Sequence, residues 1–370
     1  MDIFLGKERE IGIISLISII LISNGLLFYI QNMTAADLKN TVFEQQKELQ
    51  MQATSDIARH IGSDINLVMS MLYGLANSHY IQLEELGGDN TTKLLDDAYN
   101  KHNLTIDSLF ILDKNDVMVN TISAQPSEFF LGEDFSFRDW VKQTRGSLEP
   151  VFSNGDFERQ QILREFISYP ILNQDTGQYT GMIVTSIPTI PFFAHYGNVQ
   201  DISSKFLVVF DENGLMLANG ASETLVGQNF FDNYTQEFIN HNKILNDVTR
   251  NLLNGKSGFA VYDYGRGERL TTQYPANVNN QSSFFIQIVT PTAEIYSKID
   301  NALSEQRNGI VSLSIVASII AIAVLVILLR RWNVILRREV KRRTQELEDS
   351  YNEMKHYMVE VLRDLYRDNK

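Results

Sequence analysis

Two uninterrupted apolar stretches lie near the ends of the chain, and a long polar region separates them. Residues 11–31 and 309–329 contain no charged side chain. A helix of about 20 apolar residues crosses a bilayer core of roughly 30 Å, so each stretch is predicted to be a transmembrane helix. A buried core helix is the alternative for both, and a cleaved signal peptide is a further alternative for the first. The first stretch lacks a small-x-small cleavage site before Met33, which favours an uncleaved anchor.

The residues that follow the second stretch predict the orientation of the chain. Basic side chains near membrane spans remain on the cytoplasmic side. The basic residues after this stretch are Arg330, Arg331, Arg337, Arg338, Lys341, Arg342 and Arg343. We therefore expect a two-pass protein of the plasma membrane, with residues 1–10 and 330–370 in the cytoplasm and residues 32–308 outside the cell.

The region after the first stretch has the spacing of a long helix. Residues 32–86 contain no proline. Apolar side chains recur there at intervals of three or four residues, at Ile57, Ile61, Ile65, Val68, Leu72 and Leu75. This spacing places them along one face of a helix and predicts an extracytoplasmic stalk that ends at Gly87 and Gly88.

A repeated strand–turn–strand pattern divides the rest of the exterior region. Residues 108–120 and 206–219 both place apolar runs on either side of a turn rich in Asp and Asn, which is typical of a β-hairpin. Further strands are predicted after each hairpin, at residues 164–172, 179–187, 258–264, 268–274 and 283–290. We therefore predict an α+β fold with two similar tandem modules, a membrane-distal one at residues 87–190 and a membrane-proximal one at residues 191–305.

The segment after the second apolar stretch has a heptad pattern. Apolar positions alternate four and three residues apart at Val340, Thr344, Leu347, Tyr351, Met354, Met358, Val361 and Leu365. This pattern indicates a coiled coil within residues 330–370. The alternative is a single amphipathic helix that lies on the membrane. Together with the stalk, a coiled coil favours a parallel homodimer.

The composition excludes several classes of function. The chain carries 45 acidic and 32 basic side chains, a formal net charge of −13, so a nucleic-acid partner is not expected. It contains no cysteine, which excludes disulfides, a thiolate nucleophile and cysteine-ligated metals.

No catalytic or metal-binding motif is complete in this sequence. Residues 254–258 resemble part of a phosphate-binding loop, but Arg250 stands where its first glycine belongs. The turns DKND and DENG lack the glutamate that ends a calcium loop, and the six histidines have no zinc-site spacing. His356 lacks the neighbours of a phospho-accepting histidine. We therefore expect no enzymatic activity, no metal and no cofactor.

Several segments together carry a resemblance to a known family. They are the LDKND and FDENG hairpins, FSFRDWVKQTRGSLEPVFSN, EFISYPI, GMIVTSI and FFIQIVTPTAEIY. In this order they resemble the double Cache domain, the extracytoplasmic sensor of many chemoreceptors and sensor kinases. The resemblance covers roughly residues 35–305. It implies two PAS-like modules, the membrane-distal of which holds a small-molecule pocket.

The resemblance also implies which residues bind the ligand. Arg138 and Trp140 match the family's Arg-x-Trp motif, whereas Ser186 replaces an Asp that pairs with a ligand ammonium. The sequence therefore favours a small organic acid, gripped by Arg138. Phe137, Tyr169 and Ser186 are the other expected ligand-binding residues besides Arg138 and Trp140.

Each of these residues has an alternative role. Arg138 could form a structural ion pair, Trp140 could belong to the core, and the Tyr169 hydroxyl could point into solvent. The second module has no comparable Arg-x-Trp, so we expect it to be structural.

These observations predict a membrane-anchored sensor. Ligand binding would pass through the second transmembrane helix to the cytoplasmic coiled coil and then to a separate signalling protein. One alternative is a surface scaffold with a vestigial pocket. Another is the sensor part of a truncated histidine kinase or chemoreceptor.

Overall fold

The computed structural model describes residues 2–83, 85–102, 105–124, 130–153, 155–157, 162–199, 204–279 and 281–367. It divides into two compact units. The folded unit comprises residues 39–299, and the helical unit comprises residues 1–38 and 300–370. The fold is mixed α+β, with a long N-terminal helix and two antiparallel sheets, as the sequence predicts.

The first sheet has the strand order β2-β1-β6-β5-β3, and β4 also pairs with β5. Its strands are β1 (Ser108–Asp113), β2 (Met118–Ser123), β3 (Val151–Phe152), β4 (Asp156–Phe157), β5 (Leu163–Leu172) and β6 (Tyr179–Pro188). The hairpin and the two strands predicted after it are therefore confirmed.

The second sheet repeats this arrangement, with the order β8-β7-β11-β10-β9. Its strands are β7 (Phe206–Phe210), β8 (Met216–Asn219), β9 (Gly258–Tyr262), β10 (Arg269–Val278) and β11 (Gln281–Pro291). In both sheets the hairpin pairs with the last strand, because β1 pairs with β6 and β7 pairs with β11.

The two hairpin turns are built in the same way. Asp113 Oδ1 accepts hydrogen bonds from the backbone N–H groups of Asn115 at 2.8 Å and Val117 at 3.0 Å. Asp211 Oδ1 accepts the equivalent bonds from Asn213 and Leu215, each at 2.8 Å. Such local Asp-to-backbone bonds satisfy the donors of a tight turn. The repeat seen in the sequence is thus a structural repeat.

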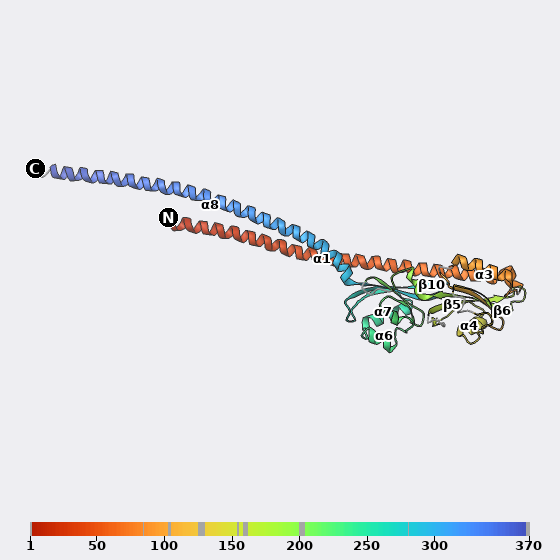
Figure 1. Ribbon diagram of the computed structural model, residues 1–370. Coiled ribbons are helices and arrows are strands. Elements are labelled where there is room, and N and C mark those ends of the chain that lie inside the picture. The colour runs from red at the N-terminus through yellow and green to blue at the C-terminus, as the bar shows by residue number, and fades with distance from the viewer. Residues whose placement is uncertain are drawn as a thin grey trace. The chain divides into compact units, whose positions relative to one another are not determined.

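Helices cover both faces of each sheet (Figure 1). Helix α1 runs along one face, whereas α4 and the pair α6 and α7 lie on the opposite faces of the first and second sheets. The helices are α1 (Asp2–Ala76), α2 (His79–Gln82), α3 (Asp89–His102), α4 (Asp139–Ser147), α5 (Thr189–Ala194), α6 (Asn233–Phe238), α7 (Lys243–Leu253) and α8 (Thr292–Arg367), with a short 3₁₀ turn at Glu223–Leu225. We call the first sheet with α3 and α4 the first module, and the second sheet with α6 and α7 the second module.

One hydrophobic core joins α1 to both sheets. The predicted apolar stripe of α1 is buried, and Ile61, Ile65 and Leu72 have no exposed surface. The same cluster contains Ile183 of the first sheet and Ile286 of the second. Burying one such side chain contributes about 1.5–3 kcal/mol. The stripe therefore holds the two modules on one helix.

Buried polar contacts fix how α1 lies along the second sheet. Gln50 Nε2 donates to the carbonyl of Ile288 at 2.9 Å, and Gln50 Oε1 accepts from Thr290 Oγ1 at 2.7 Å. The hydroxyls of Thr54 and Thr272 are 2.6 Å apart. A shift of α1 along the sheet would leave these buried groups unsatisfied, so they specify its register.

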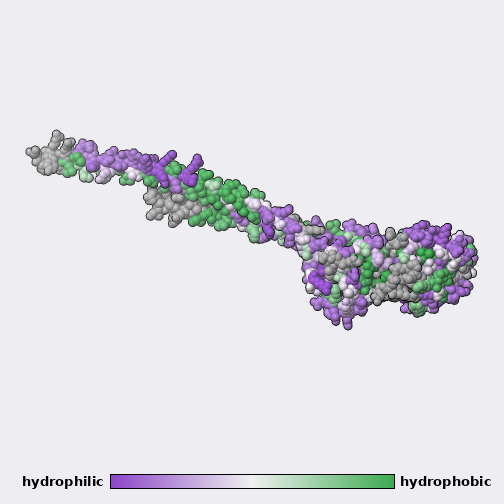
Figure 2. All heavy atoms as spheres, viewed as in Figure 1, coloured by the Kyte–Doolittle hydropathy of each residue, from purple (hydrophilic) through white to green (hydrophobic). Residues whose placement is uncertain are grey.

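The helical unit contains exposed hydrophobic surface. Among the residues that the structure describes, one helix segment, Leu303–Leu362, is long and apolar enough to cross a membrane. Its side chains are exposed, as at Leu313 and Ile319, and Figure 2 shows a band of hydrophobic residues on these helices. In the first predicted span, the side chains of residues 11–13, 16 and 19 lie outside the described part.

We predict opposite effects for two glycine substitutions in α1. A Cβ at Gly62 would lie 2.5 Å from the carbonyl oxygen of Asn277, whereas a Cβ at Gly74 would meet no atom within 4 Å. Overpacking costs about 1–3 kcal/mol, and alanine is favoured over glycine in a helix by about 1 kcal/mol. Gly62→Ala should therefore lower the free energy of unfolding, while Gly74→Ala should raise it.

Thermal unfolding of the two variants measures this difference. Equal shifts in the same direction would contradict the close approach of α1 to the β10–β11 hairpin.

Candidate functional site

An ion pair with a buried carboxylate positions α4 on the outer face of the first sheet, which is the face opposite to the one that packs on α1 (Figure 1). Arg145, in the last turn of α4, pairs with Asp116 in the β1–β2 turn. The Tyr179 hydroxyl donates to the same carboxylate at 3.4 Å. Burial raises the pKa of Asp116, and the Arg145 guanidinium opposes this rise. The contact joins the last turn of α4 to the β1–β2 turn and so fixes the orientation of α4 on the sheet.

Trp140 fills the space between α4 and the sheet. Its ring stacks on Phe166 with centroids 5.4 Å apart and an interplanar angle of 11°. It is 5% exposed, and its indole N–H has no acceptor among the residues that the structure describes. Trp140 is therefore part of an aromatic core that still offers one unused hydrogen-bond donor.

A polar cluster lies on the same face of the sheet. Arg164 is fully buried, and its Nε is 2.8 Å from the carboxylate of Asp107. Ser186 donates to that carboxylate, and its hydroxyl is 2.5 Å from the hydroxyl of Ser108. Because Ser186 is opposite Phe166 in the β5–β6 ladder, this cluster and Trp140 share one face.

Sequence reasoning missed Asp107 and Arg164. The antiparallel register pairs Ser108 with Ser186 and so places Asp107 beside the residue that replaces the family's Asp. A local signal existed for Arg164, which is a charged residue in the otherwise buried strand β5. No local signal connects Asp107 with Ser186, because 78 residues separate Ser108 from Ser186.

Arg138 and Phe137 precede α4. Arg138 is the N-cap residue, with an extended backbone, and it is half-buried. Its guanidinium lies 5.1 Å from the centroid of the Phe137 ring. Phe137 itself is 62% exposed. Arg138 is thus near the start of the helix that carries Trp140, and Phe137 is at the surface.

Tyr169 lies on the opposite face of the first sheet. Neighbouring residues of a strand point to opposite faces, and Tyr169 packs on the core that contains α1, with its ring 6.0 Å from that of Tyr73. Burial, followed by the nearby Tyr73 and Glu149, raises its pKa. It lines a groove of about 620 Å³ with α1 and the β10–β11 hairpin. The structure therefore does not bring Tyr169 together with Trp140 and Ser186.

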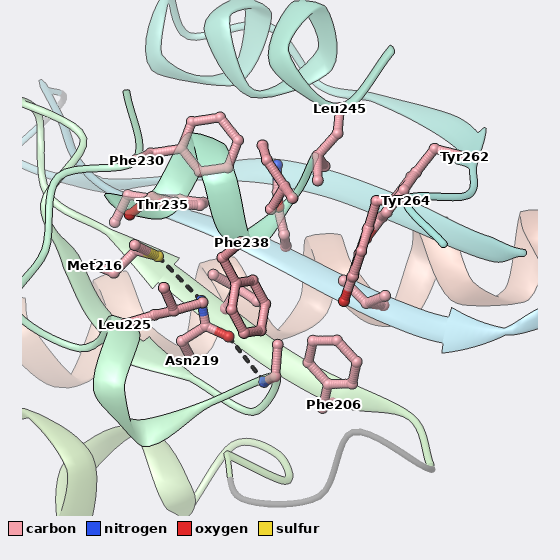
Figure 3. A pocket seen from close by; sticks show the side chains of 16 residues that line it. Phe206, Met216, Asn219, Leu225, Phe230, Thr235, Phe238, Leu245, Tyr262 and Tyr264 are labelled. Carbon is pink, nitrogen blue, oxygen red and sulfur yellow. Dashed lines mark hydrogen bonds between the residues drawn. The ribbon is translucent and has the colours of Figure 1, made fainter. Parts of the chain in front are cut away.

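The second module contains a small cavity on the outer face of its sheet. Its volume is about 30 Å³. Figure 3 shows the rings of Phe206, Phe238 and Tyr264 around it, with Leu245 of α7 on one side. Asn219 lies in the wall, where its amide contacts Met216 Sδ at 3.0 Å. The walls are mainly aromatic and aliphatic, so the cavity suits a small apolar group.

The described residues contain no group of three or more His, Asp or Glu side chains that could hold a metal ion.

The sequence of the first module matches a known family. Residues 73–188 match the family described as "HK/GC/Chemotaxis protein-like, sensor domain". No curated protein matches the chain.

Solved structures share the fold of the folded unit. The ligand-binding domain of the Pseudomonas fluorescens chemoreceptor CtaA, in complex with L-isoleucine, is 13% identical with a TM-score of 0.52, and the match covers 70% of this chain and 98% of that chain. The extracellular domain of mmHK1S-Z3, a protein classed as a histidine kinase, is 10% identical with a TM-score of 0.51 and the same coverages, 70% and 98%.

A further match is an extracellular ligand binding receptor from Desulfohalobium retbaense DSM5692, which is 14% identical with a TM-score of 0.49. The match covers 64% of this chain, and this chain spans 39% of the length of that receptor. The family match and the shared two-sheet fold confirm the resemblance to double Cache domains. Residues 73–188 therefore resemble the sensor domains that this family model describes.

Proposed function

We propose that this chain is a membrane-anchored sensor, rather than an enzyme, and that the first module binds a small molecule outside the cell. The observation that carries this proposal is the outer face of the first sheet. There the aromatic pair Trp140 and Phe166 lies beside a buried cluster of Asp107, Arg164 and Ser186. An apolar surface with a few convergent polar groups is the usual composition of a small-molecule site.

The charges on this face favour a ligand with a carboxylate. The charge of Asp107 is already balanced by Arg164, and its oxygens already accept from Ser186 and Arg164. It is therefore poorly suited to neutralise a ligand ammonium. Arg138, near the start of α4, supplies a guanidinium that can bind a carboxylate, and the Trp140 indole supplies a further donor. We propose a small organic acid as the ligand.

The connection from the second sheet suggests how binding is relayed. Strand β11 is paired on both sides, by β7 and β10, and α8 begins at the residue after it. A displacement of the sheet would therefore act directly on α8. We propose that α8 crosses the membrane at residues 309–329 and that residues 330–370 form a cytoplasmic coiled coil of a parallel homodimer, which acts on a signalling partner. Such a relay requires the ligand to bind two states with different affinity.

Polar contacts in the helical unit support a membrane span at residues 11–31, in addition to the span at residues 309–329. Asn24 Nδ2 lies 3.5 Å from Ser318 Oγ, and Ser314 donates to Asn24 Oδ1. Interhelical hydrogen bonds of this kind stabilise helix pairs in membranes. We propose that α1 and α8 form a two-helix anchor with both termini in the cytoplasm.

Ligand binding is testable through Trp140. The chain has two tryptophans, so Trp332→Phe leaves Trp140 as the only one. We expect a small carboxylate to change the Trp140 emission of this full-length variant in nanodiscs. At 100 times its dissociation constant it should also add about 2.7 kcal/mol of stability. The change in Trp140 emission should be lost in Arg138→Ala and retained in Arg59→Ala, an exposed arginine of α1.

Amino acids and amines belong in the same screen. Responses to amines alone would overturn the carboxylate proposal, and no response to any compound would favour a scaffold with a vestigial pocket.

We predict that Asp107 is essential for stability. Asp107→Ala leaves Arg164, which has no exposed surface, without this carboxylate. Removing one partner of a buried ion pair destabilises a protein by about 3 kcal/mol or more. Asp247→Ala, which breaks the exposed pair with Arg250, should cost no more than about 0.5 kcal/mol. Chemical unfolding of both variants gives the comparison, and similar losses would contradict the structural role of Asp107.

The chain contains no cysteine, so introduced cysteines can test the helix pair directly. Asn24→Cys combined with Ser314→Cys should form an intramolecular disulfide under mild oxidation in membranes. Asn24→Cys combined with Leu313→Cys should not, because Leu313 is 72% exposed. Equal cross-linking in the two double variants would contradict the pairing of α1 and α8.

A further inference from the structure

The second module contains a buried arginine that has no ion-pair partner among the residues that the structure describes. Arg269 begins β10 and is 4% exposed. Its Nη2 donates to the carbonyl of Arg266 at 3.3 Å, whereas Nε and Nη1 have no acceptor among the described residues. The neighbouring acids Asp263 and Glu268 are exposed. A buried guanidinium is costly unless an anion and hydrogen-bond acceptors compensate it. Arg269 is therefore a candidate anion-binding group.

Strand pairing places Arg269 at the cavity in the second module. Arg269 is opposite Tyr262 in the β9–β10 ladder, so the two side chains share one face of the sheet. Its guanidinium lies 4.9 Å from the centroid of the Tyr264 ring. Tyr262 and Tyr264 both line the cavity, and Figure 3 shows them side by side at its edge. The guanidinium is thus next to two of the residues that line the apolar space.

Two buried hydroxyls near the cavity also lack partners. Thr271 is on the same face as Arg269, two residues further along β10, and it is opposite the cavity residue Val289. Thr235 of α6 is in the cavity wall. Both are at most 1% exposed, and neither hydroxyl has a hydrogen-bond partner in the part of the chain that the structure describes. Unpaired buried polar groups are rare in native proteins, so each of these hydroxyls is a hydrogen-bonding group that a bound molecule can use.

The cavity limits the size of that ligand. Its volume of about 30 Å³ is far below the roughly 150 Å³ of a cavity that holds benzene. A methyl or ethyl group fits such a space with small movements of the walls. The side chains of Phe206, Leu225 and Phe238 form an apolar surface for it. The exposed Arg266, whose guanidinium is 4.2 Å from the ring of the lining residue Phe238, adds a second positive charge near the cavity.

We propose that Arg269 and this cavity form a second ligand site, specific for a short monocarboxylate such as acetate or propionate. The carboxylate accepts from the Arg269 guanidinium and the Thr271 hydroxyl, and the hydrocarbon end enters the cavity. The sequence favours a purely structural second module, and this site revises that expectation. The proposal is independent of the site proposed in the first module.

Thermal unfolding of the full-length protein in nanodiscs tests this site. Sodium acetate and sodium propionate are compared with sodium chloride at the same ionic strength. At about 100 times the dissociation constant, either carboxylate should raise the unfolding midpoint by about 5 °C. Sodium octanoate should give no such rise, because its chain exceeds the cavity.

Arg269→Met provides the decisive variant. Replacing an uncompensated buried charge by an apolar side chain of similar length does not destabilise a protein, so its midpoint without ligand should equal or exceed that of the wild type. Its response to acetate and propionate should be lost. Arg250→Met, at an exposed arginine of the same module, should keep the response. Arg138→Ala should also keep it, which separates this site from the one in the first module.

Four results would overturn the proposal. They are a wild-type protein that responds to neither carboxylate, an equal response to chloride, a response that persists in Arg269→Met, and a midpoint of Arg269→Met several degrees below the wild type. The last result would show that Arg269 has a structural role.

Discussion

The packing of α1 on the inner faces of both sheets is the constraint on which the folded unit depends. A single hydrophobic cluster contains the stripe of α1, Ile183 of the first sheet and Ile286 of the second. Buried bonds from Gln50 to β11 prevent this helix from sliding along the second sheet. Because neither sheet could bury its inner face alone, each module needs α1.

Because α1 occupies the inner faces, shorter helices cover the outer faces, and both proposed ligand sites lie there (Figure 1). In the first module α4 covers the outer face. The buried Arg164 of strand β5 has a carboxylate partner in Asp107. In the second module α6 and α7 cover the outer face of the sheet. Arg269 there has no carboxylate partner among the described residues. Two copies of one structural repeat thus have different charge arrangements on equivalent surfaces, and this difference is the basis for proposing a separate site in each module.

The strand that ends the second module links the sheet to the helical unit. Strand β11 has neighbours on both sides, so its position depends on β7, β10 and Gln50 of α1. Residue Thr292, immediately after it, begins α8. In the proposed relay, a ligand that changes the packing of the outer face would act on a strand that continues into this helix. The polar contacts of Asn24 with Ser314 and Ser318 then connect this helix, α8, to α1 in the helical unit.

The sequence by itself determined the elements of this protein. Periodic apolar residues predict α1, and the paired Asp-rich turns predict the repeat, because both signals depend only on neighbours along the chain. The tertiary structure alone decided which side chains meet. Ladder register brings Asp107 to Ser186, places Arg269 opposite Tyr262, and turns Tyr169 away from Trp140. A one-residue change in register would reverse the face of each side chain, and local sequence does not specify the pairing of distant strands.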